Sequence, residues 1–257
     1  MSPLLHWFGR RLADYLSKPT RGAQVATSST EMLEAALRPG DVLLIEGNTR
    51  ISVAIKYLTQ STWSHAAFCI GDALGPPRPG EDARILVEAD LREGVRAVPI
   101  GAFAGLHTRI CRPVGLSQED LRKVIDFVVS HIGGQYDLKN VIDLARYLIP
   151  TPPVPVRWRR RMLAFGSGDP TRAICSTLIA AALEQVRYPI LPDVTVEGTN
   201  DPACLDCHRE VMHIRHHSLY TPRDFDISPY FEVVKPTLTQ FDFHRLVWAD
   251  QPVLTGT

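Results

Sequence analysis

The segment at residues 173–186 restricts the fold more than any other part of this sequence. Hydrophobic residues recur along it at helical spacing, and its first charged residue is Glu184. A helix that is apolar around its whole circumference is usually buried at the centre of a domain. We therefore expect the other elements to pack around this helix.

Short apolar segments separated by turn residues predict the strands of the domain. The strand candidates are residues 42–45, 65–71, 84–89, 95–100, 108–112, 230–234 and 241–248. Further helices are expected at residues 30–37, 51–59, 118–130 and 138–148. Ser117 is the expected N-cap of the third of these helices, because acidic residues fill the first turn that follows it.

The composition is that of a globular protein with one large domain or two small ones. The 257 residues are 45% hydrophobic and 22% charged, which is close to ordinary usage. The 28 Lys and Arg residues balance 28 Asp and Glu residues, so no overall field attracts the chain to nucleic acid. No run of about 18 apolar residues occurs, so no transmembrane span is predicted.

Cysteine usage and the first residues bear on the expected compartment. The five cysteines are an odd number in a large chain, which does not suggest a disulfide framework. The apolar residues at the start are interrupted by Arg10, Arg11 and Asp14, and no small-residue cleavage site follows. We therefore expect a reducing, cytoplasmic setting.

Residues 3–17 are expected to form an amphipathic helix, because Phe8 and Leu12 share one face with other apolar residues. This helix either packs on the domain or lies at a membrane surface, and Trp7 favours the second alternative. Residues 1–29 are assigned to this helix and a linker.

The main domain is assigned to residues 30–257. It contains a proline- and arginine-rich insertion at about residues 150–170, in which Trp158 stands among four arginines. We interpret this insertion as a solvated or lipid-facing loop, although arginines of this kind could also contact phosphate.

Cys175 is the first candidate for chemistry, because it lies at the start of the buried helix. The dipole and the unpaired N–H groups at a helix N-terminus stabilise a thiolate and lower the pKa of a cysteine. The alternative is a buried, inert thiol, which is also the interpretation for Cys69 and Cys111 within apolar strands.

A thiolate nucleophile needs a base, usually a histidine that is held by a third polar group. His65 opens an apolar strand, which would place its ring at a strand edge. Glu88 ends another apolar strand, and a carboxylate facing the core would need a cation such as protonated His65. Each residue alone is weak evidence, since a histidine at the start of a strand often only marks the polar boundary of the strand and has no catalytic role.

The order of the motifs resembles that of the circularly permuted papain-like cysteine hydrolases. These are the YiiX/YaeF-like family, related to the NlpC cell-wall peptidases and more distantly to lecithin:retinol acyltransferase. The histidine strand precedes the cysteine helix here, whereas the ordinary papain order is the reverse. The matching motifs are Gly40-Asp41-Val42, Ser64-His65, Glu88, Gly133-Gly134-Gln135-Tyr136-Asp137, Ile174-Cys175-Ser176-Thr177-Leu178 and Tyr220-Thr221-Pro222-Arg223-Asp224-Phe225.

The resemblance implies an α+β fold, with an antiparallel sheet or partial barrel packed on the cysteine helix. It implies that Cys175 is the nucleophile, His65 the general base, Glu88 the orienting acid and Tyr136 a residue lining the site. The backbone N–H of Cys175 would contribute to an oxyanion hole. The inserted loop between Tyr136 and Cys175 departs from the family pattern and could reshape the substrate channel.

The implied activity is that of a thiol-dependent amidase or peptidase, or of an acyltransferase, working through a cysteine thioester. The substrate would be an amide-linked peptide or lipid, and no nucleic-acid partner is expected. The alternative is a peripheral membrane or partner-binding module that has lost turnover.

Cys204 and Cys207 form a second group, in the sequence Cys-Leu-Asp-Cys-His. A zinc site could use both thiols with two of the four nearby histidines, His208, His213, His216 and His217. The other interpretations are unligated thiols and a redox pair, and c-type haem attachment would require export. No other cofactor is expected.

Overall fold

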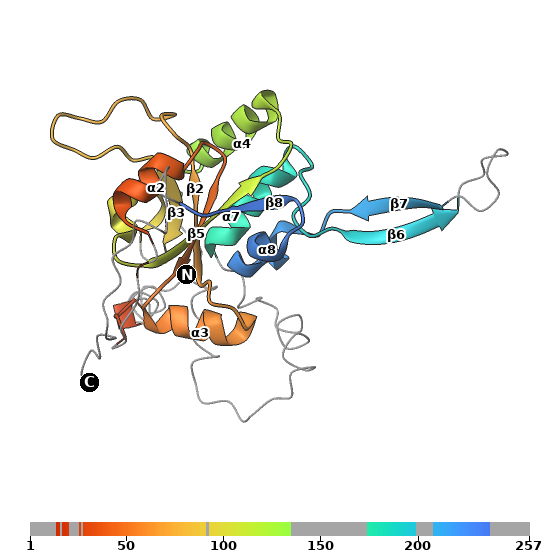
Figure 1. Cartoon of the computed structure of the whole chain (residues 1–257), viewed down its shortest axis with the longest axis horizontal. Coiled ribbons are helices and arrows are strands. Elements are labelled where there is room, and N and C mark those ends of the chain that lie inside the picture. Colours follow the sequence, from red (N-terminus) through yellow and green to blue (C-terminus); the bar gives the residue numbers. More distant parts are fainter. Residues whose placement is uncertain are drawn as a thin grey trace, which may run out of the picture.

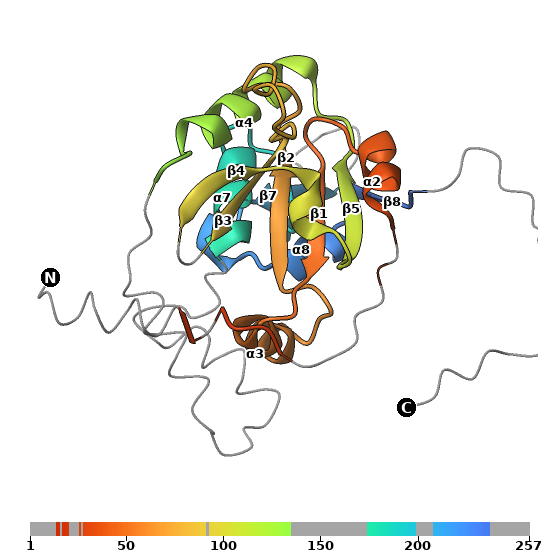
Figure 2. The ribbon, with the colours of Figure 1, turned by 90° about the vertical axis from the view of Figure 1, so that its left-hand side faces the viewer.

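The structure is a computed structural model that describes residues 14–15, 17–20, 26, 28–90, 93–134, 174–198 and 208–236. Its centre is a six-stranded antiparallel sheet in the order β4-β3-β2-β1-β5-β8 (Figures 1 and 2). The strands are β1 (Val42–Glu46), β2 (His65–Cys69), β3 (Leu86–Asp90), β4 (Gly94–Val98), β5 (His107–Pro113) and β8 (Phe231–Val234). The expected strands at these places are thus confirmed, with shifted ends.

Helices and 3₁₀ turns surround the sheet. They are α2 (Thr30–Ala36), α3 (Arg50–Thr59), α4 (Gln118–Ser130), α7 (Ile174–Glu184), α8 (Pro222–Ile227), η1 (Ile100–Phe103) and η2 (His217–Leu219). The mixture of helices with an antiparallel sheet confirms the α+β class. The short helix α8 was not predicted, although a capping box between Thr221 and Asp224 and a proline in its first turn mark its start.

Helix α7 packs against β2, β3 and α4, and Figure 2 shows it behind the sheet. On this face, α7 and α4 bury the larger of two apolar clusters, which includes Phe68 and Ile179. The opposite face buries a second cluster under α2 and η1, which includes Leu43 and Phe103. Because both faces are covered, β1 is apolar at every position from Val42 to Ile45 instead of alternating. The expectation of a central apolar helix is confirmed.

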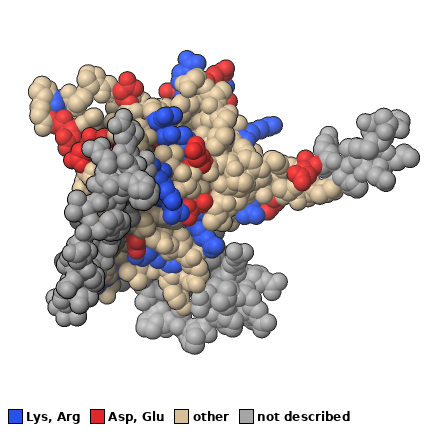
Figure 3. Space-filling view, in the orientation of Figure 1, with Lys and Arg blue, Asp and Glu red and all other residues tan. Residues whose placement is uncertain are grey.

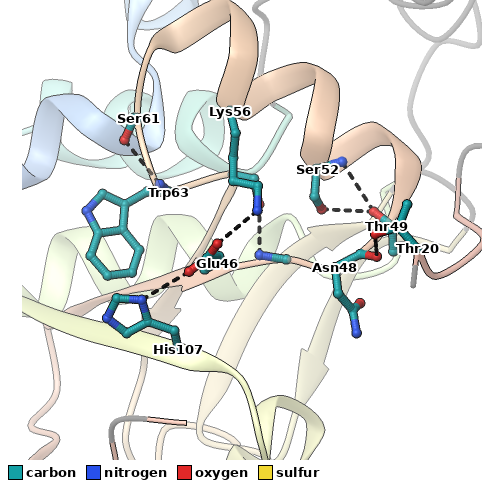
Figure 4. Close-up of polar contacts among 11 residues, drawn as sticks. Thr20, Glu46, Asn48, Thr49, Ser52, Lys56, Ser61, Trp63 and His107 are labelled. Atoms are coloured by element: carbon teal, nitrogen blue, oxygen red, sulfur yellow. Dashed lines mark hydrogen bonds and ion pairs between the residues drawn. The ribbon is translucent and has the colours of Figure 1, made fainter. Parts of the chain in front are cut away.

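Side-chain caps fix where several helices begin. Ser117 accepts the N–H of Asp120 at the start of α4, as expected from the sequence. Thr49 caps α3 in the same way by accepting the N–H of Ser52 (Figure 4).

The chain before α2 contacts the loop that leads into α3. The backbone N–H of Thr20 donates to the carbonyl of Asn48, and that of Arg50 donates to Lys18. The guanidinium of Arg50 also lies 4.0 Å from the centre of the Tyr15 ring. These contacts tie Tyr15, Lys18 and Thr20 to α3 and the loop before it.

Strands β6 (Asp193–Gly198) and β7 (His208–His213) form a separate antiparallel hairpin that projects from the body (Figure 1). The sequence predicted no strands here. Val194 and Val196 do alternate with polar residues as in a strand, so this signal was missed. In the structure the side chains of Val194, Val196 and Met212 are exposed.

Positive and negative side chains are interspersed over the described part of the face in Figure 3. No helix among the described residues is long and apolar enough to span a bilayer. The expected elements at residues 138–148 and 241–248, most of the helix at 3–17 and the insertion at about residues 150–170 lie outside the described residues.

Candidate active site

Two neighbouring strands bring His65 and Glu88 together. His65 is the first residue of β2, and Glu88 is the third residue of β3, which pairs antiparallel with β2. The Nε2 atom of His65 lies 2.6 Å from Oε2 of Glu88. The side chain of Glu88 is only 6% exposed, whereas that of His65 is 23% exposed. The ring therefore reaches the surface while its partner is buried.

Cys175 lies in the first turn of α7, next to this pair. Its side chain is buried, and it lies close enough to the His65 ring to shift the pKa of that ring. The other side of the ring faces Phe103 of η1, with 6.1 Å between ring centres. Because Cys175 belongs to the cluster under α7 and Phe103 to the cluster under η1, the ring stands where the two layers meet.

The surroundings of His65 favour its charged form. Burial by itself would lower the pKa of His65, but the Cys175 thiolate and the Glu88 carboxylate together raise it to about 10. Burial would raise the pKa of Glu88, yet its contacts with His65 and Arg96 hold that pKa below the usual value. At neutral pH these surroundings therefore favour an imidazolium at His65 beside a Glu88 carboxylate.

Arg96 of β4 is a member of this arrangement that the sequence did not reveal. It stands opposite Glu88 in the register of β3 and β4. Its Nε and Nη2 atoms lie 2.8 and 2.7 Å from Oε1 of Glu88. In the sequence, Arg96 is a single charged residue in the otherwise apolar segment Val95–Val98. Its partner can be identified only when the pairing of β3 with β4 is known.

The start of α7 is held in place by a buried hydrogen bond. The hydroxyl of Ser176 donates to the backbone carbonyl of Tyr220, at a distance of 2.7 Å. Both residues are buried. This bond fixes the residue that follows the thiol.

Polar contacts also fix Trp63 and Ser64, the two residues before His65. The hydroxyl of Ser64 accepts the N–H of Gly47, and the indole N–H of Trp63 donates to Asp226 of α8. The Trp63 ring lies 4.9 Å from that of His107. These contacts position the start of β2.

A charged cluster lies beside Trp63, as Figure 4 shows. Glu46 contacts Lys56 of α3 at 2.9 Å and His107 of β5 at 3.1 Å. This cluster links α3 to the ends of β1 and β5.

The other described cysteines have surroundings that suit inert thiols. Burial raises the pKa of Cys69 to about 11 and that of Cys111 to about 12. Both are free and lie in the sheet. They therefore offer matched controls for the chemistry of Cys175.

Several predicted features cannot be placed. Tyr136, Cys204 and Cys207 lie outside the described residues. Among the described residues, no group of three or more His, Cys, Asp or Glu side chains is arranged to hold a metal ion. The zinc site thus stays a prediction. His216 and His217 stack at 4.1 Å, and His217 contacts Glu184 of α7.

Part of the chain matches a known protein family. Residues 36–147 match the family model of the permuted papain-like amidase enzymes, the YaeF/YiiX, C92 family. This match confirms the resemblance and the permuted papain-like fold. The enzymes of this family are amidases or peptidases, which supports a cysteine hydrolase. It includes His65 and Glu88 and ends before α7 and Cys175. A search of curated proteins found no match.

Proposed function

Because residues 36–147 match the permuted papain-like amidases, we propose that this protein is an amidase whose nucleophile is Cys175. The observation that carries the proposal is the His65 ring itself, which contacts the Glu88 carboxylate at 2.6 Å and whose pKa the nearby Cys175 also raises. Cys175 and His65 are the catalytic residues, and Glu88 positions His65.

The contact with Glu88 assigns the two ring nitrogens of His65. Nε2 donates its hydrogen to the carboxylate, so Nδ1 is the nitrogen left for Cys175. The carboxylate stabilises the imidazolium and prevents the ring from turning. Nδ1 then holds the proton that the leaving group of an amide requires.

The reaction begins when the Cys175 thiolate attacks the carbonyl carbon of the substrate. A carbon–sulfur bond forms, and the electron pair of the carbonyl moves onto oxygen. When the tetrahedral intermediate collapses, the carbon–nitrogen bond breaks and Nδ1 of His65 protonates the departing amine. A thioester and a neutral imidazole remain.

Hydrolysis completes the cycle. The neutral Nδ1 takes a proton from water as the water oxygen attacks the thioester carbonyl. Collapse then breaks the carbon–sulfur bond, releases a carboxylic acid and restores the thiolate–imidazolium pair. An amine or alcohol in place of water would make the same site an acyltransferase.

The start of α7 supports the negative charge of both intermediates. The N–H groups in the first turn of a helix lack helical acceptors and carry the positive end of the dipole. The backbone N–H of Cys175 is one of them, so it can donate to the oxyanion that forms next to its own side chain.

The test is to trap the thioester. The protein is incubated with a panel of N-acyl and peptide p-nitroanilides and the corresponding p-nitrophenyl esters, and its intact mass is measured. We expect an acyl adduct on Cys175 that hydroxylamine removes and that Cys175→Ala lacks. Cys69→Ala should still form it, because that thiol is buried and has a raised pKa.

The products separate the alternatives. Release of the free acid indicates an amidase, and transfer of the acyl group to added amines or lipids indicates an acyltransferase. If no adduct forms with any substrate, or if Cys175→Ala forms the same adduct, the proposal is wrong and a binding module becomes the better description.

A further inference from the structure

We propose that Arg96 is a positioning residue that fixes the orientation and the charge of Glu88, and through Glu88 those of His65. The inference rests on the proposed function, because it assigns Arg96 a role in the same site. It extends the arrangement to four groups on three adjacent strands and one helix: Cys175 of α7, His65 of β2, Glu88 of β3 and Arg96 of β4.

The two oxygens of Glu88 have separate partners. Oε1 accepts from Nε and Nη2 of Arg96, and Oε2 accepts from Nε2 of His65. Rotation of the carboxylate would break both sets of contacts. Arg96 therefore holds the carboxylate in the orientation in which one oxygen points at His65.

Burial makes this second partner necessary. The side chain of Glu88 is 6% exposed, and a buried carboxylate is costly unless opposite charges and hydrogen bonds compensate it. His65 supplies one hydrogen bond to Glu88 but also faces the Cys175 thiolate. The guanidinium supplies a permanent positive charge that does not depend on the protonation of His65.

Arg96 is itself held from the solvent side. Its Nη1 lies 2.6 Å from Oε2 of Glu93, in an exposed contact three residues away in sequence. Asp90 adds a second negative charge nearby. Arg96 is 36% exposed. Its guanidinium thus reaches from the buried Glu88 carboxylate to Glu93 near the surface, where Asp90 adds negative charge.

The geometry predicts that charge alone is not enough. A guanidinium has two N–H directions in one plane, and these match the contact with Oε1. A lysine ammonium is a compact point charge on a flexible stem. Arg96→Lys should therefore keep the charge of Glu88 but lose part of its orientation.

The experiment measures the rate at which iodoacetamide alkylates Cys175, as a function of pH, with peptide mapping to identify the thiol. Wild type, Arg96→Met and Arg96→Lys are compared, and the melting temperature is recorded for each. In Arg96→Met, the lost positive charge raises the pKa of Glu88, so the acid limb of the profile should move up by about one pH unit. Arg96→Lys should restore more than half of that shift.

Arg215→Met is the matched control. Nε and Nη2 of Arg215 both contact one oxygen of Asp193, at 2.9 and 2.6 Å. Its side chain is 40% exposed, close to the value for Arg96, but it belongs to the base of the projecting hairpin. Its loss should leave the Cys175 profile unchanged.

The outcomes distinguish this inference from the proposed function. Preferential alkylation of Cys175 with a profile that is the same in wild type and in Arg96→Met would overturn the role of Arg96 alone. A wild-type Cys175 that is not alkylated preferentially would overturn the proposed function first. Equal shifts in Arg96→Met and Arg215→Met would mean that a general loss of charge or stability, and not positioning, moves the profile, and would also overturn the inference.

Discussion

The Nε2 atom of His65 lies 2.6 Å from a carboxylate oxygen of Glu88, so only Nδ1 of the ring is left for Cys175. This contact selects a tautomer and a ring orientation at once. A histidine without such a partner could turn either nitrogen toward the thiol, and only part of its population would be ready to transfer a proton.

Replacing Glu88 by glutamine tests this relationship. The amide keeps the shape of the side chain but removes the negative charge, so the imidazolium loses a stabilising partner. The pKa of His65 should fall by about one unit, as measured by NMR titration. Acylation should slow, though less than in Cys175→Ala, because an amide oxygen can still accept the ring N–H. An unchanged titration together with unchanged activity would remove Glu88 from the site, and Asp90 would be the next residue to test.

The dependence of acylation on pH should differ between amides and activated esters. An amine leaving group needs a proton from the imidazolium, and the raised pKa of His65, about 10, keeps that proton in place through neutral pH. Amide acylation should therefore decline only as the pH rises toward 10, instead of near 6.5. A p-nitrophenyl ester with the same acyl group leaves without a proton and should show no such decline, which makes it the control. A decline near pH 6.5 with the amide would contradict the thiolate–imidazolium pair.

The bond between Ser176 and Tyr220 should matter for stability. Ser176→Ala leaves the buried carbonyl of Tyr220 without this donor, which costs about 1–3 kcal/mol of unfolding free energy. The melting temperature should fall measurably, and acylation should fall with it because the start of α7 is less firmly held. Ser130→Ala is the control, since its hydroxyl donates to a carbonyl on an exposed part of α4. Equal melting temperatures for the two variants would show that Ser176 does not anchor the helix.

Residues 1–13 should contribute to membrane binding if the predicted amphipathic helix lies at a lipid surface. Their deletion keeps residues 15–20, which contact the loop before α3. We expect sedimentation with anionic liposomes to fall while the melting temperature stays the same. A large loss of thermal stability would instead favour a helix that packs on the domain, and unchanged sedimentation would remove the anchor.

The elements of the sheet and the central helix could be predicted because their residues are buried on both sides. The apolar run of β1 and the cap at Ser117 are local patterns that need no knowledge of the fold. The hairpin β6–β7 was not predicted, although Val194 and Val196 alternate with polar residues as in a strand. Its strands are defined by their register with each other, which is not encoded in the hydrophobicity of either strand alone.

The same distinction between local patterns and strand register explains which residues of the candidate site could be predicted from the sequence. Cys175 could be named as a candidate from its place at the start of an apolar helix, and His65 and Glu88 from the order of motifs in the chain. Arg96 could not, because its meaning depends on the register that places it opposite Glu88. The contact of Trp63 with Asp226 joins residues 163 positions apart, and no local pattern predicts such a contact.

The most direct test of the account is the reaction of Cys175 with iodoacetamide at pH 6, in wild type and in His65→Ala. If His65 holds Cys175 as a thiolate, the wild-type residue should be alkylated much faster than Cys69 and Cys111, whose raised pKa values keep them protonated. Loss of His65 should slow the reaction at Cys175 by at least about tenfold, because one unit of pKa corresponds to that change in thiolate population. Preferential labelling of Cys204 or Cys207, or an equal rate at Cys175 in both proteins, would contradict the thiolate–imidazolium pair on which the proposed activity depends.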